Sequence, residues 1–394
     1  MQVKGFLAAA VPAGIWYAGR LDLGIIFSQT PAVSAGAFTT NKVKAAPVLL
    51  DMERLRSGLA QAVLVNSGNA NACTGQDGMD QAVAASALAA RELGIGESLV
   101  QVASTGVIGQ PLSVEPFAKA MPALVSRLSA DGFEELSRAI MTTDLVPKVA
   151  EAKALIDGVE VSILGLAKGS GMIMPNMATM LCFVVTDANI AFPVLDQLVK
   201  SGVERSFNRI TVDGDTSTND MALVMANGAA GNALIDDADA EAAALFGSAL
   251  FSVFKDLALK IVADGEGATK LATIKVAGAR SEAEAVDAAR TIANSPLVKT
   301  AFFGEDANWG RIIAALGRST CSFDQNRVAI SFDGVKLVEN GVFVGAEAET
   351  AATGVLKQRQ FTVTVQLSEG DAEAEFHTCD FSYDYVKINA DYRS

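Results

Sequence analysis

The sequence contains a single histidine, His377, in 394 residues. A serine–histidine–aspartate catalytic triad or a cysteine–histidine dyad would have to use this residue, and metal-binding motifs with two histidines cannot form. No GxSxG motif supplies a matching serine. The alternating pattern around His377 predicts a strand, on which we expect this side chain to be at the surface or half-buried. Nucleophilic catalysis by this chain would therefore need a proton acceptor other than imidazole.

Cysteine is also scarce. The four cysteines are far apart and form no CxxC pair: Cys73, Cys182, Cys321 and Cys379. In a long chain without a secretory signal, this spacing is typical of reduced, structural thiols and not of a disulfide framework or a zinc site. The N-terminus lacks the apolar stretch of a signal peptide, and apolar runs such as residues 180–185 are too short to cross a bilayer. We therefore expect a cytoplasmic protein.

Basic residues are too few to balance the acidic ones. The chain has 31 lysines and arginines against 45 aspartates and glutamates, a formal charge of −14. Such a surface repels phosphate backbones and anionic lipid, so we expect neither nucleic acid nor a membrane as a partner. Half of the residues are hydrophobic, which is enough for one large core or two moderate ones. With 10 prolines and no glycine- and serine-rich linker, the composition marks no domain boundary.

Hydrophobic patterns predict strands and helices in a mixed order. Strands are expected at residues 23–27, 48–50, 62–65 and 180–186, and helices at residues 79–93, 115–128, 133–141, 194–207, 238–262 and 282–293. Residues 150–166 predict a hairpin, because Asp157 and Gly158 suit the positive φ values of a type I′ turn. Further strands follow toward the C-terminus. Because strict βαβ spacing is absent, we predict an α/β protein, a mixed α+β layered sandwich, and not a doubly wound parallel sheet.

Residues 168–181, KGSGMIMPNMATML, combine two glycines, a proline and a lysine with the start of a strand. A Walker phosphate-binding loop is excluded, because Ala167 stands where a glycine must precede the lysine. The hydroxyl of Thr179 could instead attack the carbonyl of Ala178, giving an ester that water opens. The released α-amino group, with a pKa near ~8, could accept the hydroxyl proton. Local chemistry leaves open that this segment is an ordinary turn before a strand.

Other motifs extend the pattern along the whole chain. They are FTTN at 38–41, AAPV at 45–48, NSGNANACTG at 66–75, STGVIG at 104–109, MTTD at 141–144, VDGDTSTND at 212–220, DGEGATK at 264–270, NWGR at 308–311 and YVKINADYRS at 385–394. Together with residues 168–181, and in this order, they resemble the ornithine acetyltransferases of arginine biosynthesis, the ArgJ family. The resemblance implies a self-processing enzyme with an N-terminal threonine nucleophile.

The resemblance also implies a reaction and its machinery. The chain would cleave itself before Thr179 into an α chain, 1–178, and a β chain, 179–394. These would stay associated and assemble further. Thr179 would carry an acetyl group from N2-acetylornithine to glutamate, and Thr105 with Gly106 would form the oxyanion hole, an arrangement suited to the charge that develops in acyl transfer. The family needs no metal or organic cofactor, and whether acetyl-CoA also serves as donor stays open.

Substrate contacts implied by the resemblance are Thr142, Lys168, Thr179, Glu266, Asn389 and Ser394. Lys168 could pair with the carboxylate of an amino-acid substrate and Glu266 with its ammonium. Without the family, Lys168 would be a solvated loop cation, Glu266 a surface carboxylate and residues 389–394 an ordinary disordered end.

Departures from the family pattern leave the implied catalytic residues in place. They are Met174, where relatives often carry alanine or histidine, Ala263, where a basic residue is usual, and Ala307, where proline is usual. We expect the loss of a cation at position 263 to affect substrate affinity and not the class of enzyme.

Three alternatives compete with parts of this interpretation. Asp213, Asp215 and Asp220 have the Asp-x-Asp spacing of a calcium loop, but the rest of that pattern is missing, so we favour a hydrogen-bonded turn. The chain could be a self-processing amidase or aminopeptidase in which water accepts the acyl group. It could also be a non-catalytic amino-acid-binding protein that never cleaves.

Overall fold

The computed structural model describes residues 2–16, 18–174 and 180–391, so Ala178, Thr179 and Ser394 lie outside the described residues. The chain forms two compact units, one made chiefly of Met1–Asn208 and Asp215–Ile261 and the other of Arg209–Gly214 and Val262–Arg393. These units do not coincide with the fragments expected from cleavage before residue 179, which remain a prediction.

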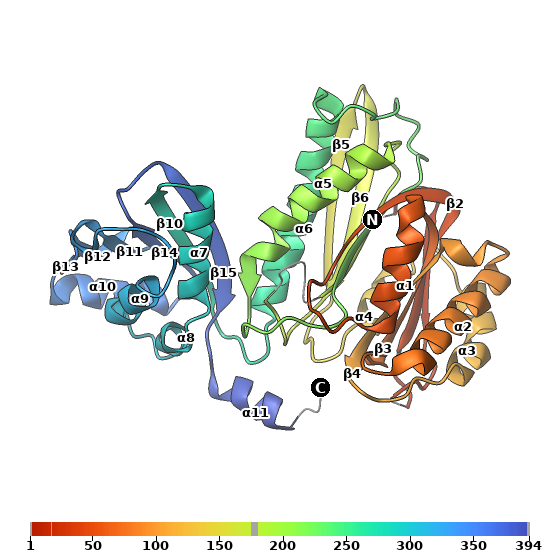
Figure 1. Cartoon of the computed structure of the whole chain (residues 1–394), viewed down its shortest axis with the longest axis horizontal. Coiled ribbons are helices and arrows are strands. Elements are labelled where there is room, and N and C mark those ends of the chain that lie inside the picture. Colours follow the sequence, from red (N-terminus) through yellow and green to blue (C-terminus); the bar gives the residue numbers. More distant parts are fainter. Residues whose placement is uncertain (1, 17, 175–179, 392–394) are drawn as a thin grey trace. The chain divides into compact units, whose positions relative to one another are not determined.

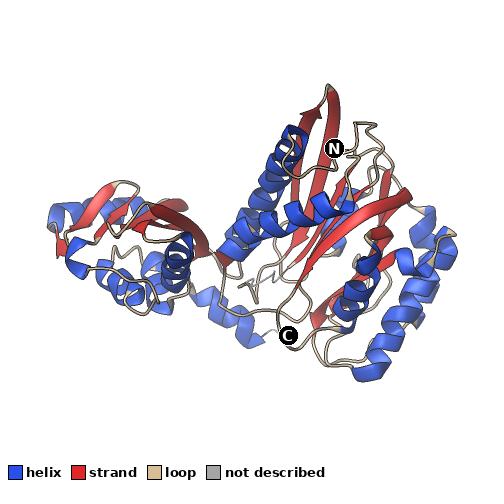
Figure 2. Cartoon of the chain, turned by 45° about the horizontal axis from the view of Figure 1, so that its top comes forward, coloured by secondary structure: helices blue, strands red, loops and turns tan. Residues whose placement is uncertain are grey.

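The first unit is built on one mixed sheet (Figures 1 and 2). Its strands are β1 (Phe6–Val11), β2 (Leu23–Phe38), β3 (Leu59–Asn69), β4 (Val100–Val107), β5 (Lys148–Ile156), β6 (Val159–Lys168), β7 (Leu181–Thr186) and β9 (Met221–Ala226). Its helices are α1 (Ala46–Arg54), α2 (Gly75–Leu93), α3 (Glu115–Ser126), α4 (Phe133–Ala139), α5 (Phe192–Arg205) and α6 (Glu241–Ala263), whose last residues enter the second unit. The strand order is β4-β3-β2-β9-β7-β6-β5, with β1 paired to β2. Pairs β3–β4 and β7–β9 are parallel and the others antiparallel.

Helices cover this sheet because its strands are apolar on both faces. Val63 and Leu64 of β3 are both buried but belong to different apolar clusters, since neighbouring strand residues point to opposite faces. The cluster of Leu64 includes residues of α2 and α3, and that of Val63 includes residues of α4. Along β6, Gly165 faces Val253 of α6, and Gly202 of α5 faces Phe254 of α6. Helices α5 and α6 therefore pack against each other, and they cross at an angle in Figure 2. This is the expected layered arrangement.

Two side chains of α1 form hydrogen bonds with the main chain of β4, the edge strand of the sheet. Asp51 Oδ1 accepts a hydrogen bond from the main-chain N–H of Val102 at 2.9 Å, and Arg54 donates to the carbonyl of Val100 at 2.6 Å. Burial raises the pKa of Asp51 well above its usual value. These bonds satisfy polar groups of an edge strand that could otherwise pair with another chain.

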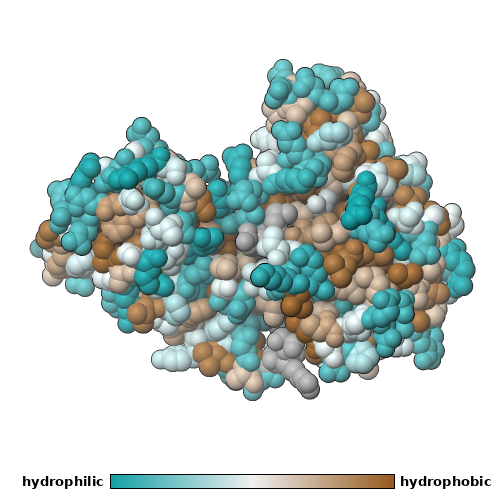
Figure 3. Space-filling view, in the orientation of Figure 1, coloured by the Kyte–Doolittle hydropathy of each residue, from teal (hydrophilic) through white to brown (hydrophobic). Residues whose placement is uncertain are grey.

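The second unit has its own sheet, in the order β13-β12-β11-β14-β10-β15-β8. Its strands are β8 (Ile210–Thr211), β10 (Leu271–Ala279), β11 (Ala329–Phe332), β12 (Val335–Glu339), β13 (Val342–Phe343), β14 (Gln360–Gln366) and β15 (Ala372–Cys379). Its helices are α7 (Glu282–Ala293), α8 (Pro296–Phe303), α9 (Trp309–Leu316), α10 (Ala346–Leu356) and α11 (Tyr383–Asp391). Alternate residues of β14 and β10 join residues of α7 to α10 in one apolar core. In the view of Figure 3, the surface of each unit carries many hydrophilic side chains, and apolar side chains are scattered among these.

Most expected elements are confirmed, including the hairpin, in which Asp157 and Gly158 have φ values of 49° and 82°. The strand expected at residues 48–50 is wrong, because these residues lie in α1. A three-residue apolar run does not distinguish a strand from a helix. Pro47 indicates the helix, because it lies in the first turn of α1 and its fixed φ favours helix initiation.

The expectation for the His377 side chain was wrong, whereas all four cysteines are free, as expected. His377 is neither half-buried nor at the surface: it is only 8% exposed on β15, where its Nδ1 lies 3.0 Å from Thr273 Oγ1. Of the four free cysteines, Cys73 is exposed and the other three are buried.

One helix of the described part of the chain, α6, is long and apolar enough to cross a membrane by length and composition. Its buried residues recur every three or four positions, as in Phe246, Leu250 and Leu257, and Phe254 packs at Gly202 of α5. This helix therefore buries one face within the protein.

Candidate active site

Three of the residues singled out in the sequence meet at the end of β6. Lys168 Nζ donates hydrogen bonds to Thr105 Oγ1 at 3.0 Å and to Thr142 Oγ1 at 2.9 Å. Thr105 comes from β4 and Thr142 from the connection between α4 and β5. Lys168 is half-buried, so it is not the solvated loop cation of the alternative interpretation. The fold brings together an ammonium group and two hydroxyls from segments up to 63 positions apart.

A buried carboxylate that sequence reasoning left without a role supports this cluster. Asp144 accepts hydrogen bonds from Lys148 Nζ at 2.6 Å, from the N–H of Gly169 at 2.7 Å and from the N–H of Thr142 at 3.0 Å. The side chains of Asp144 and Lys148 are almost completely inaccessible to solvent. Asp144 thereby ties Thr142 to the residue that follows Lys168. The MTTD motif contained Asp144, but nothing in the sequence revealed its burial.

The charge on Asp144 is maintained by its neighbours. Burial raises the pKa of this carboxyl group, but the positive charges of Lys168 and Lys148 and the N–H of Gly169 outweigh burial and lower the pKa from 3.8 to about 2. Asp144 is therefore ionised at neutral pH, and its charge balances part of the positive charge at the site.

This pKa predicts a specific acid sensitivity. Because the folded-state pKa lies below the unfolded value, the stabilisation is fully present above about pH 4 and is lost as the pH falls toward 2. A shift of this size corresponds to about 2 kcal/mol of the free energy of unfolding. We expect urea unfolding measured from pH 5 to pH 2 to show this loss in the wild type. In Asp144→Asn, the part of this pH dependence that comes from Asp144 should be absent. The same pH dependence of the free energy of unfolding in both proteins would contradict the assignment.

The predicted oxyanion element, Thr105 and Gly106, lies where the pairing of β3 and β4 becomes irregular. Gly106 has φ = 135°, and a Cβ atom there would lie 2.2 Å from the main-chain carbon of Gly68 and 2.5 Å from the nitrogen of Asn69. Only glycine fits this conformation and this contact. The main chain therefore takes a fixed, unusual course directly after Thr105.

The residues before the predicted cleavage bond are held by the turn that follows β8. Ile173 and Thr216 form an isolated β-bridge, Met174 N–H donates to Asp215 O at 2.8 Å, and Thr216 Oγ1 donates to Met174 O at 2.9 Å. Met174 makes these contacts with its main chain, so they do not depend on its departure from the family pattern. No group of three or more potential metal-ligating residues occurs in the described ranges.

Glu266 and Asn389 meet in the second unit. Asn389 Nδ2 donates to Glu266 Oε2 at 2.9 Å, and Glu266 is 6% exposed, so it is not a surface carboxylate. Asp380 accepts from the N–H groups of Thr269 and Lys270. Residues 383–391 form helix α11 instead of a disordered end.

An ammonium group between two hydroxyls, next to a main-chain turn that requires glycine, is the kind of site found in enzymes that bind a carboxylate or stabilise an oxyanion. Comparison with known proteins identifies the particular group. The model of the ArgJ family matches residues 7–394. The chain is 58% identical to the arginine biosynthesis bifunctional protein ArgJ of Desulfotalea psychrophila and 54% identical to that of Geobacter sulfurreducens, each over 394 residues and the full length of both chains. The chain therefore belongs to the ArgJ family.

A solved structure agrees with this assignment. The arginine biosynthesis bifunctional protein ArgJ of Bacillus halodurans superimposes with a TM-score of 0.52 at 44% identity, covering 53% of this chain and 98% of that one. The resemblance inferred from the sequence motifs is confirmed, and so is the mixed α/β class. The chain is an acyltransferase of arginine biosynthesis and acts on small molecules.

Proposed function

We propose that this protein transfers an acetyl group from N2-acetylornithine to glutamate, giving ornithine and N-acetylglutamate. The observation that carries the proposal is the cluster of Lys168, Thr105 and Thr142, since it places a cation and hydroxyl groups beside the predicted oxyanion element. Membership of a family whose relatives are named as arginine biosynthesis proteins supports the same reaction.

The first step is self-cleavage. The hydroxyl of Thr179 attacks the carbonyl carbon of Ala178, the acyl group moves from nitrogen to oxygen, and water hydrolyses the ester. Chain 1–178 then ends in a carboxylate and chain 179–394 begins with the amino group of Thr179. We propose that both fragments stay associated.

Acetyl transfer uses the new terminus twice. The α-amino group of Thr179 accepts the hydroxyl proton while the oxygen attacks the acetyl carbonyl of N2-acetylornithine. Ornithine leaves with a proton, and the α-amine of glutamate then attacks the acetyl ester and regenerates the threonine hydroxyl. We propose that Thr105 and Gly106 stabilise the oxyanion in each step, which is a contribution of roughly 3 to 4 kcal/mol per donor.

Substrate recognition follows from charge. Lys168 and Thr142 suit a carboxylate, and Glu266 with Asn389 suits an ammonium group, because hydrogen bonds to charged groups are the strong ones. We propose each pair separately as a substrate contact, with Thr179 and Ser394 as further contacts. We also propose a cytoplasmic location, assembly of the α/β pair into a larger oligomer, and no cofactor. Acetyl-CoA as a second acetyl donor is in keeping with relatives named bifunctional.

Product analysis tests the reaction. Purified wild-type protein supplied with N2-acetylornithine and glutamate is expected to form N-acetylglutamate and ornithine in equal amounts, with ping-pong kinetics. Ornithine and acetate formed at the same rate without glutamate would identify an amidase instead. A single uncleaved chain without turnover would identify a binding protein and overturn the proposal.

A further inference from the structure

Residues 215–220, here called the 215–220 segment, contact both Ser104, the residue before the oxyanion element, and the main chain before the predicted cleavage bond. All of the contacts described below lie within the first unit. The segment belongs to the VDGDTSTND motif, to which the proposed function gives no task.

At one end of this segment, Asn219 joins the ends of two strands. Its Nδ2 donates to the carbonyl oxygen of Ala70 at 2.6 Å and to that of Ser104 at 2.8 Å. Its Oδ1 accepts from Thr218 Oγ1 at 2.6 Å. Asn219 is 6% exposed. Because both amide hydrogens and the amide oxygen are engaged, the orientation of this side chain is fixed.

The bond to Ser104 bears directly on the oxyanion element. The carbonyl of Ser104 and the N–H of Thr105 belong to one planar peptide group, so fixing one orients the other. The ladder of β3 and β4 pairs Asn66 with Ser104 and Ser67 with Thr105, and its register shifts directly afterwards, at Gly68 and Asn69. The bond from Asn219 therefore acts where the regular pairing ends.

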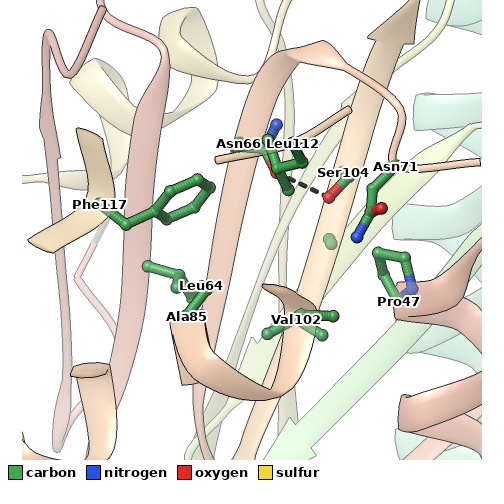
Figure 4. A pocket seen from close by; sticks show the side chains of 11 residues that line it. Pro47, Leu64, Asn66, Asn71, Ala85, Val102, Ser104, Leu112 and Phe117 are labelled. Atoms are coloured by element: carbon green, nitrogen blue, oxygen red, sulfur yellow. Dashed lines mark hydrogen bonds between the residues drawn. The ribbon is translucent and has the colours of Figure 1, made fainter. Parts of the chain in front are cut away.

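Ser104 is buried and borders a cavity of about 10 Å³, roughly the space of one water molecule. Asn66 and Val102 are among the other residues that line it. Figure 4 shows Ser104 at its wall, where Ser104 Oγ donates to Asn66 Oδ1 at 2.6 Å. Hydrogen bonds to Asn66 and from Asn219 thus hold Ser104 in addition to packing.

The other end of the segment holds the chain before the cleavage bond. Thr216 Oγ1 donates to the carbonyl of Met174 at 2.9 Å, five residues before Thr179. Asn41 Nδ2 in turn donates to the carbonyl of Thr216 at 2.9 Å. Asn41 thus holds the 215–220 segment through a contact that involves neither the oxyanion element nor the residues before the cleavage bond.

We infer that Asn219 is a positioning residue for the oxyanion element, and that the 215–220 segment sets the place of this element relative to the residues before the cleavage bond. The inference rests on the proposed function. Asn219 touches no reacting atom in this scheme; it acts through the Ser104–Thr105 peptide. Its loss displaces the oxyanion element in both self-cleavage and acetyl transfer.

The test compares Asn219→Asp with a matched control, Asn232→Asp. Asn232 is 3% exposed, and its Nδ2 also donates to two carbonyl oxygens, those of Asn189 and Ala233, while its Oδ1 accepts from the N–H of Asn189. Both substitutions keep the shape and remove the same two donors. Asn219→Ser and Asn232→Ser form a second pair if either aspartate variant fails to fold, as judged by circular dichroism.

Self-cleavage is followed by intact mass in freshly purified precursor, and kcat and KM are measured on cleaved protein with N2-acetylornithine and glutamate. We expect the Asn219 variants to cleave more slowly and to lose about 10- to 100-fold in kcat, since a small misplacement of a catalytic group costs rate. KM should stay within about 3-fold, because Lys168 and Thr142 are unchanged. The Asn232 variants should keep kcat within about 2-fold.

Equal behaviour of the Asn219 and Asn232 variants, with wild-type protein that cleaves and transfers, would overturn this inference and leave the proposed function intact. Wild-type protein that neither cleaves nor transfers would overturn both. Thr216→Val tests the other end: loss of one hydrogen bond to Met174 should slow self-cleavage about 3- to 10-fold. An unchanged cleavage rate would show that the bond from Thr216 to Met174 does not help to position the residues before the cleavage bond.

Discussion

Replacing Thr179 by alanine is expected to leave the chain whole, at 40.9 kDa, and to abolish acetyl transfer. Alanine has no hydroxyl to attack the carbonyl of Ala178, so no new N-terminus forms. The variant also lacks the nucleophile for the acetyl group. We expect a loss of at least about 1,000-fold in transfer rate. Intact mass and N-terminal sequencing measure the first effect, and the N-acetylglutamate assay measures the second.

Thr179→Ser is the matched control, because it keeps the hydroxyl and should still cleave and transfer at reduced rates. Cleavage of the alanine variant before residue 179 would show that another group breaks the bond. Transfer by an uncleaved alanine variant would show that a different nucleophile carries the acetyl group. Either result contradicts the proposed mechanism.

Replacing Asp144 by alanine is expected to lower the free energy of unfolding by about 3 to 5 kcal/mol, because it removes the carboxylate that balances the charge of the buried ammonium of Lys148. It also removes the acceptor for the N–H groups of Thr142 and Gly169. Urea unfolding near pH 7 measures the effect. Transfer activity should fall as well, since Asp144 holds Thr142 and the residue after Lys168 in place.

The adjacent hairpin offers a matched control pair. Lys153 and Glu160 form an ion pair at 2.6 Å, but both side chains are more than half exposed. Glu160→Ala should therefore change the free energy of unfolding by no more than about 0.5 kcal/mol. The double variant Asp144→Ala with Lys148→Met should recover part of the loss, because the buried charge that Asp144 balanced is gone. A double variant less stable than Asp144→Ala would refute the idea that the unbalanced charge of Lys148 causes the loss.

These experiments separate three tasks in the proposed mechanism. We propose that Thr179 supplies the nucleophile and the base and that Lys168 supplies charge beside the oxyanion element, while Asp144 and Asn219 hold main-chain segments in place. The last two have no direct part in the proposed chemistry. Their importance comes from burial, since a buried polar side chain with all its hydrogen bonds made is costly to disturb.

Local patterns in the sequence were sufficient wherever the determinant is local. Gly94, in the left-handed conformation with φ = 69°, ends α2 where the helical pattern stops. Asp157 and Gly158 form the hairpin turn for the same reason, since their own φ preferences decide it. Residues 48–50 failed as a strand because a three-residue apolar run fits either a buried strand or one face of a helix.

The sequence by itself determined the family and the class of enzyme and singled out the candidate residues Thr105, Thr142 and Lys168, because these depend on motifs readable along the chain. Only the tertiary structure decided that Lys168 bonds both threonines, that Asp144 is buried with Lys148, and that Asn219 reaches strand ends 115 and 149 positions away. The physical reason is that burial and long-range hydrogen bonds depend on which segments pack together. The residue types alone do not specify that packing.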